Sequence, residues 1–238
     1  MKHGYGRRIC IVGFVMVGLL AFCTVGQEAG KTEVNKWEND IKTFEAWDAK
    51  NSFPKDAVLF VGSSSIRMWD TARLFREYPV INRGFGGSQI SDVNLYIERI
   101  VLPYKPKVIV FYCGVNDICG AGKAPEQVVA DFNQFLDKVH PALPKTPIIF
   151  LSIRLGPAWW QHHPQSDIVN ANVEKLAETL DYLHYADVTT GMMGSDGTPE
   201  PGLFLEDKIH LTEQGNLKWA DLLRSTLKKV YDETNSKH

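Results

Sequence analysis

Short apolar runs alternate with segments of helical periodicity along most of this chain, and this alternation restricts the fold more than any other feature. The apolar runs are too short for helices and are typical of strands buried on both faces of a sheet. They are Ala57–Val61, Pro79–Asn82, Val108–Cys113, Ile148–Ile153 and Leu183–Val188. Helical spacing of apolar residues predicts helices over 34–49, 90–100, 128–139, 169–180 and from residue 212 onward.

Strands that alternate with helices in this way form a parallel sheet with helices on both faces. We therefore predict an α/β fold with three layers, α/β/α, built on a flavodoxin-like, five-stranded parallel sheet with the strand order 2-1-3-4-5. Ligand sites in such sheets lie outside the carboxyl ends of the strands. That edge is where the functional residues of this chain are expected.

The first 26 residues differ in composition from the rest of the chain. Three basic residues precede an uncharged apolar stretch that ends at Val25, which is typical of a secretory signal peptide cut after Gly26. The alternative is an uncleaved membrane anchor, because the stretch is near the lower length limit for spanning a bilayer. We expect a signal peptide over residues 1–26, a single domain over 27–238, and a secreted or periplasmic protein.

The charge balance argues against one class of partner. The whole chain has a formal net charge of −2, and residues 1–26 hold three basic residues and no acidic one, so the remainder carries −5. Nucleic-acid-binding proteins usually present a basic face. We expect no nucleic-acid partner and contact with a membrane only through an uncleaved N-terminal segment, while the oligomeric state stays open.

Two of the four cysteines lie outside the expected signal peptide, at Cys113 and Cys119. Export would permit a disulfide between them. The alternative is two free thiols, with Cys113 buried at a strand end. Two cysteines without clustered histidines do not indicate a zinc site, so we expect no metal and no organic cofactor.

Four short polar segments stand where chemistry is expected. Gly62–Ser65, Gly84–Ser88 and Gly114–Asp117 each follow one of the first three predicted strands. Because parallel strands share one carboxyl edge, these segments should meet there. Asp207–His210 precedes the last helix and can fold back over the same edge.

The residue types in these segments suit serine-based acyl transfer. A serine hydroxyl needs a base to take its proton, and His210 is the candidate. Asp207 is three residues earlier, so it can share a face with His210 and orient the imidazole. In isolation, such an Asp-x-x-His pair is more often a charge pattern at a helix start. Three consecutive serines also leave the nucleophile ambiguous from spacing alone.

An acyl-transfer site also needs hydrogen-bond donors for the oxyanion of the tetrahedral intermediate. The backbone N–H groups of Ser64 and Gly87 and the side-chain amide of Asn116 are the candidates. Glycine allows the backbone to approach a substrate closely. The alternatives are a flexible glycine turn around Gly87 and an Asx turn after a strand at Asn116.

Taken in order, these segments resemble the SGNH hydrolases, also called the GDSL esterase/lipase family. The matching blocks are Val58–Ser65, Asn82–Gly87, Gly114–Asp117 and Asp207–Thr212, and the resemblance covers about residues 55 to 230. It implies the SGNH hydrolase fold and a set of site residues. These are Ser64 as nucleophile, Asp207 and His210 as the other triad members, and Ser64, Gly87 and Asn116 as oxyanion donors.

One departure from the family pattern concerns the first block. The usual Gly-Asp-Ser-Leu reads Gly-Ser-Ser-Ser over residues 62–65, so Ser63 replaces the aspartate and Ser65 the apolar residue. The replaced aspartate is not a triad member in the family, so activity is still expected. Ser63 can make local hydrogen bonds in the turn.

The loop after the fourth strand is the candidate substrate-binding segment. Arg154 leads into it, and Trp159 and Trp160 suit stacking on a sugar ring or lining an acyl pocket. The alternative is that one tryptophan belongs to the core. The family resemblance includes secreted bacterial enzymes that deacetylate carbohydrates.

We therefore expect an exported esterase that removes short acyl groups, acetyl above all, from carbohydrate esters through an acyl-enzyme. Its partner would be a small-molecule or carbohydrate ester. One alternative is a lysophospholipase or thioesterase of the same family. The other is a non-catalytic carbohydrate-binding protein with the same fold.

Overall fold

Five parallel strands form one sheet in the order β2-β1-β3-β4-β5, which confirms the predicted order and class. The strands are β1 (Val58–Gly62), β2 (Val80–Gly84), β3 (Val108–Tyr112), β4 (Ile148–Leu151) and β5 (Leu183–Ala186). This computed structural model describes residues 1–4 and 36–236. Apart from its first four residues, the expected signal peptide lies outside the described residues.

The central strands are apolar along their whole length because the sheet is covered on both faces. Every residue of β1 and of β3 is buried. The register aligns Gly62 at the end of β1 with Gly84 on one side and Tyr112 on the other. The three strands therefore end at one level, and the segments that follow them start side by side.

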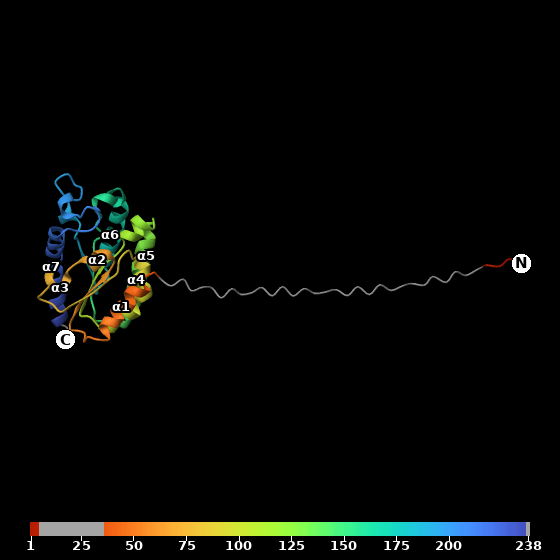
Figure 1. Ribbon diagram of the computed structural model, residues 1–238, viewed down its shortest axis with the longest axis horizontal. Helices are drawn as coiled ribbons and strands as arrows, with labels where there is room; N and C mark the ends of the chain where they lie inside the picture. Colours follow the sequence, from red (N-terminus) through yellow and green to blue (C-terminus); the bar gives the residue numbers. More distant parts are fainter. Residues whose placement is uncertain (5–35, 237–238) are drawn as a thin grey trace. The chain divides into compact units, whose positions relative to one another are not determined.

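Helices cover the two faces of the sheet as separate groups. One group is α1 (Glu38–Asp48), α4 (Ile90–Ile100), α5 (Pro125–Ala142) and α6 (His163–Ala177), and the other is α2 (Ser64–Met68), α3 (Thr71–Leu74) and α7 (Glu213–Ser236). In the first group, α4 contacts α1 and α5, and α5 contacts α6. In the second, Trp69, which follows α2, packs against Trp219 of α7 with a ring-centroid distance of 4.2 Å. Figure 1 shows α4 and α5 on one side of the strands and α3 and α7 on the other.

The predicted helices form, with differences at their ends. The helix expected from residue 34 begins at Glu38, and residues 34 and 35 are outside the described part. Helices α5 and α6 begin earlier than their apolar stripes, with Pro125 and Pro164 in their first turns, where proline suits the helix. Helices α2 and α3 were not predicted, because 5 and 4 residues are too short to show periodicity.

Within residues 1–4 and 36–236, no helix combines the length and the apolar character that crossing a membrane requires.

Candidate active site

A cavity of about 280 Å³ opens at the carboxyl edge of the sheet. The three strand ends that meet there supply its floor, and the loop before α7 closes one side. Most of the predicted site residues line it: Ser64, Gly87, Asn116, Arg154, Trp159 and His210.

Ser64 is the first residue of α2, directly after the turn that ends β1. The turn requires glycine at position 62, where φ is +150° and a Cβ would lie 1.8 Å from the carbonyl oxygen of Tyr112. Ser63 caps the helix through its carbonyl oxygen, which accepts hydrogen bonds from Ile66 and Arg67. Its side chain makes no capping hydrogen bond.

The structure distinguishes between the three consecutive serines. The Ser64 hydroxyl lies 2.9 Å from Nε2 of His210. Ser63 is buried, with only 2% of it exposed. The Ser65 hydroxyl instead accepts a long hydrogen bond of 3.4 Å from Arg154. Of the three serines, Ser64 is therefore the one whose hydroxyl contacts the candidate general base His210, as the family resemblance implied.

Asp207 holds His210 from the side opposite Ser64. Its Oδ2 lies 2.6 Å from Nδ1 of the imidazole. Its Oδ1 accepts the backbone N–H groups of Ile209 and His210, each at 2.9 Å. This tight turn puts Lys208 in the left-handed region, at φ +57°. The carboxylate and the imidazole are therefore one hydrogen-bonded unit.

The electrostatics of Asp207 follow from these contacts. Burial acts to raise the pKa of Asp207, but the hydrogen bonds from His210 and Ile209 outweigh it and lower the pKa to about 2. Asp207 is therefore ionised at neutral pH. A carboxylate in this position fixes the imidazole tautomer and stabilises the imidazolium that forms when a base takes a proton.

The loop after β4 positions the turn that carries His210. Ala158 donates its backbone N–H to the carbonyl oxygen of Lys208 at 3.2 Å. At Gly156, a Cβ would lie only 2.1 Å from the same oxygen. The two loops therefore fit together only with glycine at position 156.

The three residues expected to supply oxyanion donors, Ser64, Gly87 and Asn116, all line the cavity. As the first residue of a helix, Ser64 has a backbone N–H without a partner in that helix. Gly87 is exposed in the cavity wall with φ +75°. The side-chain nitrogen of Asn116 donates to the Ser88 carbonyl at 2.9 Å, which leaves the second hydrogen of the same nitrogen for a ligand. The three groups line one cavity.

A buried ionic network connects the two loops that carry Gly87 and Asn116. Asp117 accepts the backbone N–H of Ile90, at the start of α4, at 3.1 and 3.2 Å. Its Oδ1 also accepts a hydrogen bond from the Lys123 ammonium at 2.9 Å, and the same ammonium donates to Oδ2 of Asp131 at 2.7 Å. Burial raises the pKa of Asp117, and the hydrogen bond from Lys123 opposes this shift without cancelling it. In the sequence, Asp117 stands out only as part of the Gly114–Asp117 segment, and no pattern indicates Lys123.

Comparison with known proteins agrees with this geometry. The sequence pattern of the GDSL-like lipase/acylhydrolase family matches residues 61–218, more than half of the chain. The chain belongs to the GDSL-like lipase/acylhydrolase family. It is therefore a carboxylic-ester hydrolase. No curated protein sequence matches the chain.

Solved structures show the same fold at low sequence identity. A protein from Streptococcus pneumonia, provisionally described as a platelet activating factor, has 20% identity and a TM-score of 0.71, covering 79% of this chain and 92% of its own. A GDSL-like lipase from Bacteroides thetaiotaomicron has 18% identity and a TM-score of 0.68, covering 80% and 98%. A variant of an acetyl-xylooligosaccharide esterase from Geobacillus stearmophilus has 17% identity and a TM-score of 0.59, covering 75% and 95%.

The family's second block includes Asn82, but the sequence did not indicate the role of this residue in supporting the first block. Asn82 in β2 donates its side-chain amide to the carbonyl oxygen of Ile66 in α2 at 2.7 Å, and its side-chain oxygen accepts the backbone N–H of Gly84 at 2.9 Å. It therefore holds the helix that begins with Ser64 against the neighbouring strand. The predicted strand ended at Asn82, whereas β2 continues to Gly84, so the asparagine lies inside the strand, where this residue type is disfavoured.

The candidate substrate-binding residues of this acylhydrolase divide into two sets. Trp159 and Arg154 line the cavity. Trp160 is not brought to the cavity and stacks on His163, with a ring-centroid distance of 4.4 Å. The two tryptophans therefore do not form a joint platform. Arg154 is not on the loop surface, since only 2% of it is exposed.

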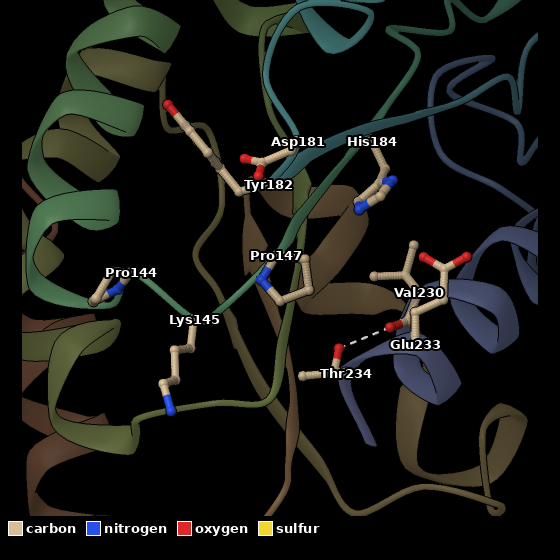
Figure 2. A pocket seen from close by; sticks show the side chains of 9 residues that line it. All are labelled: Pro144, Lys145, Pro147, Asp181, Tyr182, His184, Val230, Glu233 and Thr234. Atoms are coloured by element: carbon tan, nitrogen blue, oxygen red, sulfur yellow. Dashed lines mark hydrogen bonds between the residues drawn. The ribbon is translucent and has the colours of Figure 1, made fainter. Parts of the chain in front are cut away.

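A second cavity, of about 300 Å³, lies at the opposite edge, where β4 and β5 begin (Figure 2). It contains His184 and charged side chains, but neither serine nor cysteine is among its lining residues within the described chain. The Thr234 hydroxyl there donates to the carbonyl oxygen of Val230 at 2.8 Å, as Figure 2 shows. This cavity lacks the nucleophile that the family's chemistry needs.

The two cysteines of the described chain are free thiols, so the disulfide that export would permit does not form. Cys113 is buried at the end of β3 and donates to the Ser88 carbonyl at 3.4 Å, as the alternative anticipated. Burial raises the pKa of the Cys113 thiol well above its ordinary value, which makes it unreactive.

Proposed function

We propose that this acylhydrolase is an exported serine esterase that removes short acyl groups, acetyl above all, from carbohydrate esters. The observation that carries the proposal is the continuous hydrogen-bonded path from Asp207 through His210 to the Ser64 hydroxyl at 2.9 Å, inside a cavity lined by oxyanion donors. That set of parts is what acyl transfer through an acyl-enzyme requires.

The mechanism starts with the Ser64 hydroxyl oxygen attacking the ester carbonyl carbon while His210 takes the hydroxyl proton. The oxyanion that forms accepts hydrogen bonds from the Ser64 and Gly87 backbone and the Asn116 side chain. His210 then gives the proton to the leaving alcohol, and the acyl group remains on Ser64. A water molecule, deprotonated by His210, attacks the acyl-enzyme, and the acid leaves as the Ser64 hydroxyl is restored.

The size and lining of the cavity support a short acyl group. A volume of about 280 Å³ is just below the usual range of ligand pockets, which run from about 300 to 1,000 Å³. Most of the described residues that line the cavity are polar or glycine, and no row of aliphatic side chains among them could hold a long hydrocarbon chain. Trp159 adds one aromatic face on which a sugar ring can stack.

Two observations outside the cavity support the carbohydrate and the export parts of the proposal. One structural neighbour is an acetyl-xylooligosaccharide esterase, although at 17% identity the likeness concerns the fold. The basic start and the apolar stretch before Val25 support export.

The test is hydrolysis of aryl esters of increasing acyl length and of acetylated oligosaccharides by wild type, Ser64→Ala and Ser63→Ala. We expect Ser64→Ala to lose activity by about 10⁶-fold and Ser63→Ala to keep most of it. Equal rates for wild type and Ser64→Ala would refute the nucleophile. Preference for long acyl chains would indicate a lipase or lysophospholipase, and preference for thioesters a thioesterase. No turnover with any ester, together with retained sugar binding, would indicate a non-catalytic carbohydrate-binding protein.

A further inference from the structure

A buried arginine without a counter-ion lies beside the reacting groups. Arg154 follows β4, and only 2% of it is exposed. Its guanidinium lies over the rings of Trp219, Phe204 and Tyr112, at 5.0, 5.5 and 5.8 Å from their centroids. Contacts with ring faces stabilise a cation, but they use none of its N–H donors.

The donors of Arg154 outnumber the acceptors that the protein provides. A guanidinium has five N–H groups and stays protonated in proteins. One terminal nitrogen donates to the Ile209 carbonyl at 3.3 Å and the other to the Ser65 hydroxyl at 3.4 Å, both long for charged donors. Nε has no hydrogen-bond partner among the described residues.

No carboxylate of the described chain forms an ion pair with Arg154, and Asp207 acts on it only through space. Desolvation of an unpaired charge is costly, so an arginine in this position needs compensation. Arg154 lines the cavity, where a ligand can supply the missing acceptors.

The rest of the cavity has the same sign of charge. Arg67 is exposed at the cavity wall, and its guanidinium packs against Gly86, where a Cβ would lie 2.8 Å from the Arg67 Cζ. The described residues that line the cavity include two arginines and no aspartate or glutamate. In a chain with a net charge of −2, this is a local reversal of sign that attracts anions.

The position of Arg154 indicates which half of the ester carries the anion. Gly87 follows β2 and Arg154 follows β4, and β1 and β3 lie between these two strands. Arg154 contacts Ser65 and Ile209, which are the sequence neighbours of Ser64 and His210. It therefore lies on the side of the cavity where the general base His210 is. Because His210 protonates the leaving alcohol, the alcohol half departs toward that side.

We propose that the substrate is an ester whose alcohol half carries a carboxylate, such as an acylated acidic sugar, and that Arg154 binds this carboxylate while Arg67 adds to the attraction at the entrance. The inference rests on the proposed function, since it assigns the substrate class of the same site. A planar carboxylate fits the donor fork of a guanidinium.

The test compares pairs of esters that differ only in charge. One pair has the charge in the alcohol half, as 4-carboxyphenyl acetate against 4-carbamoylphenyl acetate. The other has it in the acyl half, as the monophenyl ester of succinate against that of succinamate. For each pair, the ratio of kcat/KM is measured in wild type, Arg154→Gln, Arg154→Lys and Arg67→Gln, with Arg76→Gln as a control that removes an exposed arginine away from the cavity.

In wild type, kcat/KM for 4-carboxyphenyl acetate should exceed that for 4-carbamoylphenyl acetate by about tenfold to hundredfold, the range for a hydrogen-bonded charge. Arg154→Gln should bring the ratio close to that of the uncatalysed hydrolysis, Arg154→Lys should keep part of the preference, and Arg67→Gln should lower it by a smaller factor. Arg76→Gln should leave the ratio unchanged. A purely structural Arg154 would change the rates of charged and neutral esters together.

A wild type without a charge preference, a preference that persists in Arg154→Gln, or a preference only for the succinate ester would overturn the inference. If Arg154→Gln does not fold, the ratios in Arg154→Lys and Arg67→Gln decide. Neutral acetates that Ser64→Ala hydrolyses as fast as wild type would instead refute the proposed function itself.

Discussion

Two hydrogen-bonded chains of ionisable groups lie at the same edge of the sheet, and they differ in exposure and in what they end on. The first runs from Asp207 to His210 and ends on the Ser64 hydroxyl. The second runs from Lys123 to Asp117 and ends on the backbone N–H of Ile90. The Asp207 side chain is 43% exposed, whereas that of Asp117 is completely buried.

The difference separates a group that can transfer a proton from a group that joins two loops. In the first chain the last member is a hydroxyl that faces a cavity, and its proton can leave during a reaction. In the second chain the last member is a peptide N–H, whose proton stays in place. The pKa shifts agree with this distinction, because the pKa of Asp207 is lowered to about 2 whereas burial raises the pKa of Asp117. Under the proposed mechanism, similar residue types thus serve catalysis in one chain and join two loops in the other.

Among the variants that test the difference between these two chains, Asp207→Asn has the largest expected effect. The variant should lose about 10⁴-fold in kcat, because an amide cannot fix the imidazole tautomer or stabilise the imidazolium. Its thermal unfolding midpoint should change little, since the asparagine oxygen can still accept the backbone N–H groups of Ile209 and His210. Ester turnover and calorimetry measure the two quantities. A loss below tenfold would mean that the first chain is not catalytic.

Asp117→Ala tests the second chain, with Asp117→Asn as its matched control. The alanine variant should lose about 3 kcal/mol of unfolding free energy, because Ile90 loses its acceptor in the core and Lys123 loses a partner. The asparagine variant keeps an acceptor for Ile90 and should lose less. Urea unfolding measures both. If alanine leaves stability unchanged but abolishes kcat in the folded protein, the distinction between the two chains is wrong.

The smallest expected effect is on folding stability at acidic pH, where protonation of the two carboxyls changes stability in opposite directions. The Asp207 pKa is lower in the folded protein than its ordinary value of 3.8, so its stabilising contribution is complete above about pH 4 and is lost as the pH falls toward about 2. Protonation of Asp117, whose pKa is raised, instead favours the folded state.

Between pH 4 and 2, Asp207→Asn should therefore lose less stability than wild type, by roughly 1 kcal/mol or less because the group is exposed to solvent. Urea unfolding at several pH values in this range provides the measurement. Parallel stability curves for the two proteins would contradict the assignment.

The sequence predicted the sheet well because its signals are local. A short apolar run marks a buried strand wherever it occurs, and topology rules then place the carboxyl ends together. The candidate site was also predictable to a large extent, since each of its four segments follows a strand or precedes a helix. His210 and Ser64 are hydrogen-bonded in the structure, as expected, although 146 positions separate them in the sequence.

What the sequence did not reveal depends on which distant groups approach each other. The contact of Asn82 with α2 and the pairing of Lys123 with Asp117 leave no periodic pattern. Arg154 illustrates the limit most clearly, because its position after a strand was predicted while its burial among three rings was not. Trp160 shows the reverse error, since a tryptophan next to Trp159 in sequence turned out to face His163 and not the cavity.

The contact between Gly156 and the carbonyl oxygen of Lys208 has a consequence for engineering. Replacing the segment after β4 to change substrate preference would also move the turn that carries His210. The two segments are in direct contact, and there is no room for a side chain at position 156. Libraries that vary both segments together should yield active variants more often than libraries that vary either one. The loop after β4 and the turn that carries His210 therefore have to be redesigned together.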